Sequence, residues 1–108
     1  YPTLGLDEWN ISSNISNKIY VGQNYPNPFN PITNIKYELY KEEFVKVTVH
    51  DILGNTIKDL LKTKQTSGNK SLKWNATDSH GRKVPAGVYF YSIEAGAYSQ
   101  TKKMILLK

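Results

Sequence analysis

With 108 residues, the chain is long enough for one domain built around one hydrophobic core. It contains no cysteine, which excludes disulfides, cysteine–zinc sites and thiol catalysis, and no run approaches the roughly 18 consecutive apolar residues of a membrane-spanning helix. The formal net charge of +5 arises within residues 58–83, where seven basic residues stand against two acidic ones. Such a stretch is typical of a solvated face, although it can also attract an anionic surface.

Residues 1–18 have the composition of a linker or of the end of a preceding domain. Six of the eight residues at positions 10–17 are Ser or Asn, whose side chains compete with the backbone for hydrogen bonds. The chain begins with Tyr1 and shows no signal-peptide pattern, so we expect a piece of a longer protein that ends naturally at Lys108. The folded domain is predicted to span residues 19–108.

The segment at positions 24–31 contains three prolines within six residues, which fix φ repeatedly and favour extended conformations in the preceding residues. Its asparagines can close Asx turns, and Tyr25 and Phe29 can pin it onto the domain. The sequence therefore predicts a stiff entry segment before the first long strand. Taken alone, this segment is best interpreted as a loop that protects a sheet edge from pairing.

From Ile19 onward the apolar residues recur with a period of two, which indicates half-buried strands. Trp74 is the expected centre of the core, and the last run is expected to be covered on both faces because it ends continuously apolar. Turn residues separate the runs, and no segment has a helical period. We therefore predict an all-β protein, an immunoglobulin-like antiparallel β-sandwich of about seven strands. The clearest runs are 35–39, 45–50, 72–74, 88–93 and 101–107.

Residues that could support catalysis or metal binding are few. The histidines are His50, on the outward phase of a strand, and His80, in a loop beside Asp78 and Ser79. Catalytic triads are assembled from separate, rigid elements, whereas such a run is typical of a turn. No metal-ligand spacing or phosphate loop is present, and the aromatic residues 89–91 alternate between core and surface. The sequence predicts no enzyme, no cofactor, no metal and no nucleic-acid partner.

A set of blocks occurs along the chain in the order NYPNPFNP, ITNIKYEL, VTVHDILGN, SLKWNATDSHGRKV, PAGVYFYSIEAG and TKKMILLK. Together they resemble the type A C-terminal sorting domain of the type IX secretion system of Bacteroidota and related bacteria. They are also similar to the immunoglobulin-like domain of flagellar hook-capping proteins. The resemblance covers about residues 19–108, and it departs from the usual Trp-Asp-Gly pattern at Asn75 and Ala76, which leaves the turn after Trp74 open.

The resemblance implies where the chain is recognised. The implied places are a proline block within residues 24–31, a turn glycine, a glycine–aromatic strand entry and a terminal block at residues 103–108. Their residues are Asn24, Pro26, Asn27, Pro28, Gly54, Gly87, Val88, Tyr89, Lys103, Met104, Ile105, Leu106, Leu107 and Lys108. Because a sorting label is recognised by its shape, we expect the last strand to be displayed at an exposed edge, where its lysines discourage wrong pairing.

The implied function is protein sorting. The resemblance implies an N-terminal passenger in the same precursor, transit through the periplasm, recognition by an outer-membrane translocon, and delivery to the cell surface or the extracellular space. It also implies a sortase that usually removes the domain and attaches the passenger to an anionic lipopolysaccharide. We expect cleavage within residues 10–18, because exposed polar segments are preferred cleavage sites. The basic stretch at 58–83 could favour contact with the lipopolysaccharide.

Two other functions are compatible with this fold. One is a carbohydrate-binding or adhesive module of a secreted enzyme, with Tyr98 or Trp9 as the aromatic platform. The other is a purely structural module that packs on its neighbour in the chain.

Overall fold

The alternating segments form strands in the computed structural model, which describes residues 19–107. The strands are β1 (Ile19–Val21), β2 (Thr33–Leu39), β3 (Glu43–Asp51), β4 (Thr56–Gln65), β5 (Gly68–Trp74), β6 (Gly87–Ala95) and β7 (Tyr98–Leu106). Within the described residues there is no helix, hence none long and apolar enough to cross a membrane. The all-β prediction is confirmed. The expected linker at 1–18 and Lys108 lie outside the described residues.

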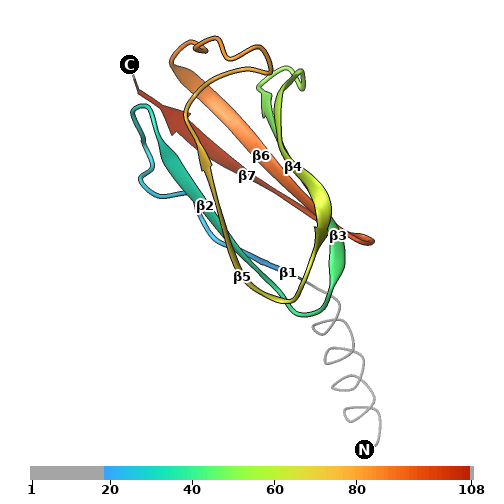
Figure 1. The fold of residues 1–108 in the computed structure, drawn as a ribbon. Coiled ribbons are helices and arrows are strands. Elements are labelled where there is room, and N and C mark those ends of the chain that lie inside the picture. Colours follow the sequence, from blue (N-terminus) through green and yellow to red (C-terminus); the bar gives the residue numbers. More distant parts are fainter. Residues whose placement is uncertain (1–18, 108) are drawn as a thin grey trace, which may run out of the picture.

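The strands form two antiparallel sheets that pack as a sandwich (Figure 1). One sheet has the strand order β1-β2-β5, and the other has the order β4-β3-β6-β7. The chain changes sheets between β2 and β3, between β4 and β5, and between β5 and β6. This arrangement confirms the predicted immunoglobulin-like sandwich of seven strands.

The core lies between the two sheets and follows the predicted alternation. In β3, Val45, Val47 and Val49 are fully buried, while the residues between them are half-buried on the outer face. Trp74 is 1% exposed, and its ring centroid lies 5.8 Å from that of Phe29 and 5.4 Å from that of Tyr89. The expectation that Trp74 centres the core is therefore confirmed.

Strand β4 is an element that the alternating pattern did not indicate. Its apolar residues Ile57, Leu60 and Leu61 do not recur with a period of two. The register with β3 shifts between Val47 and Thr48 and again between Val49 and His50, so β4 carries two irregularities of the bulge type. Each extra residue resets the side-chain phase, which allows all three apolar residues to pack against the core.

The expectation that the last run is covered on both faces is wrong. Strand β7 is an edge strand, and only alternate residues of its apolar end are buried: Met104 is 0% and Leu106 is 4% exposed. Ile105 is half-buried, and Leu107 is 51% exposed. Ile105 lies opposite Val88 on the outer face of the sheet, so the apolar run includes a cross-strand pair at the surface.

Candidate recognition surface

The motifs implied by the resemblance lie at one end of the sandwich. We call this end, which lies beside the C-terminus and opposite the start of β1, the distal pole (Figure 1). The strand register brings them there: Asp51, at the end of β3, pairs with Tyr89, which pairs with Met104. The turn containing Gly54, the start of β6 and the end of β7 are consequently neighbours.

The proline block crosses from the first sheet to the free edge of β7, at the distal pole. Phe29 donates its N–H to Ile105 O over 3.0 Å, and Leu107 donates its N–H to Phe29 O over 2.8 Å. Asn27 Oδ1 accepts the Ile105 N–H over 2.9 Å. We call these contacts the edge clamp. The edge-protecting interpretation of the block is thus correct, but the protected edge belongs to the last strand.

The edge clamp also corrects the prediction that the last strand is displayed at an exposed edge. The resemblance led us to expect the terminal block to form an exposed edge, yet Phe29 and Asn27 occupy the backbone groups of Ile105 and Leu107. The prolines on either side of Asn27 have no N–H to donate, so this segment cannot itself continue the sheet. The free part of the β7 edge lies nearer its N-terminal end.

A buried polar network holds the start of the proline block. Asn24 is 2% exposed, and its side-chain amide donates to Thr33 Oγ1 over 2.9 Å and to Pro26 O over 3.2 Å. Its backbone N–H donates to the Tyr91 hydroxyl over 2.9 Å, and that hydroxyl donates to Gly22 O over 2.8 Å. Burial raises the pKa of Tyr91 to about 12. Tyr91 therefore joins the two sheets as a neutral group.

Two loops at the distal pole share the pattern Asp-x-x-Gly-x. Asp51 Oδ1 accepts the N–H groups of the residues two and four positions on, over 3.0 and 2.9 Å. Asp78 Oδ1 likewise accepts the N–H groups of the residues two and four positions on, both over 2.9 Å. The glycines, Gly54 and Gly81, have φ of +91° and +78°. The hydrogen bond from Arg82 N–H is the main cause that lowers the pKa of Asp78.

The connection between β5 and β6 is fixed by two aromatic side chains. The Tyr89 hydroxyl donates to Pro85 O over 2.5 Å, the tyrosine-corner contact of immunoglobulin-like folds. Trp74 Nε1 donates to Thr77 O over 2.9 Å. These bonds shape one wall of a groove of about 960 Å³, which is also lined by Ile32 and Leu107. Ile32 is 48% and Leu107 51% exposed, so the groove offers an apolar surface at the distal pole.

The expected recognition residues divide into two classes by burial. Exposed residues, which are available for direct contact, are Pro26, Asn27, Pro28, Gly54, Gly87, Lys103 and Leu107. Val88 and Ile105 are half-buried. The buried residues, which can act only by holding the surface in place, are Asn24, Tyr89, Met104 and Leu106. Lys108 lies outside the described residues.

Several residues that build the distal pole were missed. Gln23 donates its side-chain amide to Lys103 O over 2.9 Å and so extends the edge clamp. Tyr91 and Ile32 were assigned no role there. The repeated Asp-x-x-Gly-x pattern was present in the sequence and could have identified Asp51 and Asp78 as turn residues. By contrast, nothing local in the sequence pairs Gln23 with a residue 80 positions away.

One serine–histidine pair forms on the outer face of the larger sheet. His50 Nε2 lies 3.0 Å from Ser92 Oγ, which lies 2.8 Å from Thr101 Oγ1. His50 Nδ1 is buried and has no hydrogen-bond partner among the described residues, so no carboxylate orients the ring as a hydrolase requires. The described residues also contain no group of three or more His, Cys, Asp or Glu that could hold a metal ion.

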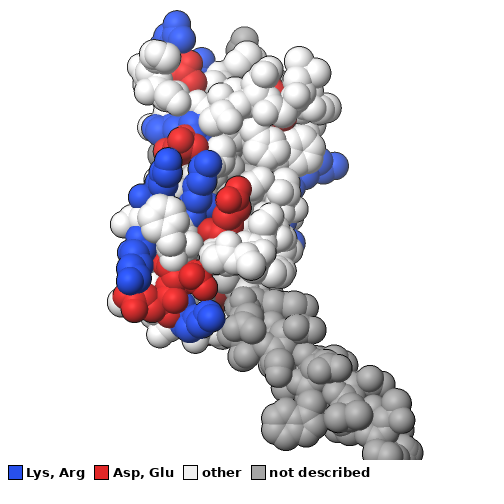
Figure 2. All heavy atoms as spheres, turned by 90° about the vertical axis from the view of Figure 1, so that its right-hand side faces the viewer, with Lys and Arg blue, Asp and Glu red and all other residues white. Residues whose placement is uncertain are grey.

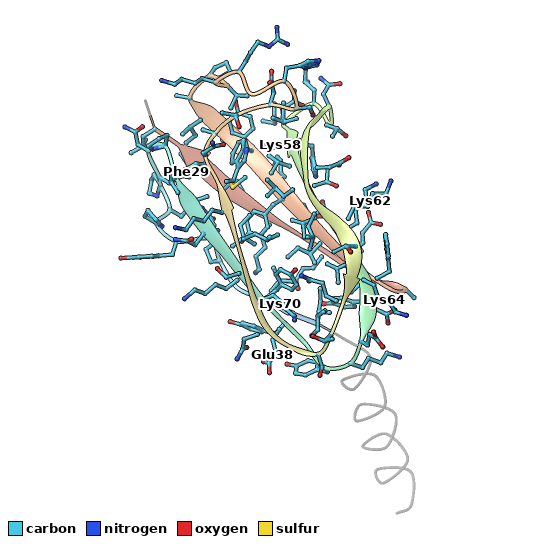
Figure 3. The ribbon with its side chains drawn as sticks, viewed as in Figure 1. Phe29, Glu38, Lys58, Lys62, Lys64 and Lys70 are labelled. Carbon is cyan, nitrogen blue, oxygen red and sulfur yellow. The ribbon has the colours of Figure 1, made fainter. Side chains whose placement is uncertain are left out.

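Tyr98 and Trp9 were considered for sugar binding, and the basic stretch at 58–83 was considered for anion binding. Tyr98 is half-buried against the core, and Trp9 lies outside the described residues. Lys58, Lys62 and Lys64 are spread along β4 (Figure 3). On the face shown in Figure 2, basic side chains are interspersed with acidic ones.

Comparisons with known proteins bear on the family of this chain. The family model described as "Secretion system C-terminal sorting domain" matches residues 23–107. No curated protein sequence matches this chain. Among solved structures, dimeric latent PorU from Porphyromonas gingivalis gives a TM-score of 0.65 at 22% identity, covering 82% of this chain and 9% of that one.

Two further structures share the fold. PorZ of Porphyromonas gingivalis, a surface component of the type IX secretion system, gives a TM-score of 0.53 at 25% identity, covering 83% of this chain and 11% of that one. FlgD from P. aeruginosa gives a TM-score of 0.54 at 18% identity, covering 81% of this chain and 70% of that one. The chain thus spans about a tenth of the PorU and PorZ chains.

Proposed function

This chain belongs to the family of secretion system C-terminal sorting domains, which are the sorting signals of type IX secretion. We propose that its distal pole is the surface that the secretion machinery recognises. Membership implies a domain that forms part of a passenger precursor and directs it to the cell surface or the extracellular space. The passenger lies N-terminal to the domain, and the precursor passes through the periplasm before an outer-membrane translocon binds it.

The observation that carries the proposal is the convergence of separate motifs on one surface. The proline block, the Gly54 turn, the start of β6 and the end of β7 come from distant parts of the sequence, yet they meet at the distal pole. The groove beside them is apolar and exposes Ile32 and Leu107. Exposed apolar surface of this kind is typical of a protein interaction site.

The geometry also supports a passive role. The edge clamp and the Asn24–Tyr91 network are structural, and the His50–Ser92 pair lacks the third group of a hydrolytic site. These contacts support a domain that is recognised as a rigid label, and the sortase that removes it is a separate protein. Cleavage falls within residues 10–18, outside the described residues.

The proposal includes contact with anionic lipopolysaccharide. Seven basic residues at 58–83 supply the attraction, but Arg82 already pairs with Asp78 at 3.4 Å. The interspersed charges in Figure 2 favour diffuse attraction over a defined anion site.

The function is tested by a fusion of the whole chain to a periplasmic reporter in a bacterium that has the type IX system. We expect the reporter at the cell surface, and in the periplasm when the translocon is deleted. A reporter that stays in the periplasm of the intact strain, although the domain is folded, contradicts the function. A glycan-binding or purely structural module predicts that result.

A further inference from the structure

The outer edge of β7 has two halves that differ in their hydrogen bonding. In the half at the distal pole, Gln23 and the edge clamp occupy four backbone groups. These groups are Lys103 O, Ile105 N–H, Ile105 O and Leu107 N–H. They belong to odd-numbered residues, so the odd-numbered residues of β7 direct their backbone groups away from β6.

The other half of this edge is open. The antiparallel register with β6 runs without a shift from Tyr98 to Leu106, so Ser99 and Thr101 also direct their backbone groups away from β6. Five groups result: the N–H and C=O of Ser99, the N–H and C=O of Thr101, and the N–H of Lys103. None of the five has a hydrogen-bond partner among residues 19–107. We call residues 99–103 the open edge.

The open edge lacks most of the devices that normally block strand pairing. At the opposite edge of the same sheet, β4 has two register shifts and carries Lys58, Lys62 and Lys64. Bulges and lysines of this kind prevent the addition of another strand. The open edge has no proline and no bulge, and its charge is confined to Lys102 and Lys103 at one end. It is therefore a regular template for pairing.

The charge at that end indicates what pairs there. Lys103 is exposed and Lys102 is half-buried, and neither forms an ion pair within the described part of the chain. Both stand close to the outward N–H of Lys103. An incoming backbone with an acidic side chain at this point would satisfy the hydrogen bonds and the charge together.

We propose that the open edge binds an extended segment of a partner polypeptide, which adds a strand to β7 and sets an acidic side chain against Lys102 or Lys103. Main-chain hydrogen bonds from Ser99 and Thr101 supply affinity, and the two lysines supply selectivity. This contact lies beside the distal pole, with which it shares Lys103, and it does not depend on the function proposed for that surface.

A pair of substitutions at Thr101 isolates the backbone contribution. Thr101→Pro removes the outward N–H and leaves the hydrogen bonds between β6 and β7 in place, because proline is tolerated where the N–H faces away from the sheet. Thr101→Val keeps the N–H and removes the same hydroxyl. The readout is photo-crosslinking from benzoylphenylalanine at position 99, in the full chain fused to a reporter and expressed in a bacterium with the type IX system.

We expect one crosslinked segment, identified by mass spectrometry, that has an acidic residue within a few positions of the crosslink. Its yield should fall by about tenfold in Thr101→Pro and stay unchanged in Thr101→Val, as expected for the loss of one strong backbone hydrogen bond. Lys103→Glu should lower the yield as well, and it serves as the deciding variant if Thr101→Pro fails to fold.

Three results would overturn the proposal: no crosslinked partner, equal yields from Thr101→Pro and Thr101→Val, or crosslinks only to a second copy of this chain. Surface delivery of the reporter, measured in the same cells, separates this proposal from the proposed function. Delivery without a crosslink contradicts the open-edge contact alone, whereas a crosslink without delivery leaves that contact intact and contradicts the sorting role.

Discussion

Asn27 and Ile105 lie 78 positions apart and are joined by a hydrogen bond of 2.9 Å from the Ile105 N–H to Asn27 Oδ1. This bond fastens the proline block to the last strand, and both segments belong to the set of blocks that resembles sorting domains. The two blocks are therefore parts of one surface, since the end of β7 keeps its edge covered only while the proline block is in place.

The edge clamp should contribute measurably to stability. Asn27→Ala removes the acceptor for the Ile105 N–H and should lower the free energy of unfolding by about 1 kcal/mol. Urea unfolding measures this effect. The matched control is Asn69→Ala in β5, whose exposed side chain makes no hydrogen bond within the described residues, and it should change stability by less than about 0.5 kcal/mol. Equal effects would show that the clamp bond does not stabilise the fold.

The link between the sheets through Tyr91 should be more costly to break. Tyr91→Phe deletes the hydroxyl that bonds Gly22 O and the Asn24 N–H, and leaves these groups without that partner. We expect a loss of about 1–3 kcal/mol in unfolding free energy. Tyr40→Phe, at an exposed tyrosine, should be neutral. A loss of unfolding free energy no larger than that of Tyr40→Phe would contradict the bridging role.

Tyr91 also predicts how stability depends on alkaline pH. Its pKa is raised from 10.0 to about 12 in the folded state by burial. Between these values the unfolded chain releases the proton while the folded chain retains it, so the stabilisation is complete below pH 10 and is lost as the pH rises towards 12. Urea unfolding at a series of pH values should show this decline. The decline should be smaller in Tyr91→Phe, and an unchanged slope would contradict the assignment.

The turn after β3 should depend on glycine for backbone reasons alone. Gly54 has φ of +91°, and a Cβ at this position would meet no atom within 4 Å. Gly54→Ala should therefore cost about 1 kcal/mol through strain, and Gly54→Asn should cost less because asparagine tolerates positive φ better. Thermal unfolding of both variants tests this order. An alanine variant as stable as the parent would contradict it.

Attraction to lipopolysaccharide through the basic stretch at 58–83 should be sensitive to salt. Binding of the chain to vesicles containing anionic lipopolysaccharide should weaken strongly between about 0.05 and 0.5 M salt, because screening shortens the reach of exposed charges. Sedimentation of the vesicles measures the bound fraction. Binding that persists at high salt would show that the basic residues do not cause the attraction.

The strands that the sequence predicted well are those with one solvated face. In β3 the alternation of Val45, Val47 and Val49 with polar residues determines which side is buried. Strand β4 was missed because two register shifts break the alternation. A bulge is set by the neighbouring strand, so the local pattern of apolar residues cannot reveal it.

The candidate surface was predicted in its parts but not in its assembly. The resemblance identified the proline block and the terminal block, but it did not indicate that Asn27 covers the backbone of Ile105. That contact depends on where β1 leaves the first sheet, which is a tertiary property. The expected display of the last strand was wrong at its C-terminal end for the same reason.

The most direct test of the central claim is surface delivery of a reporter fused to the whole chain with an acidic substitution at the distal pole. Ile32→Asp and Leu107→Asp place a charge in the apolar groove without touching the buried core, and Tyr40→Asp places one on an exposed residue at the opposite end. Both pole variants should fold normally and leave the reporter in the periplasm, while Tyr40→Asp should be delivered like the parent. Full delivery of both folded pole variants would contradict it.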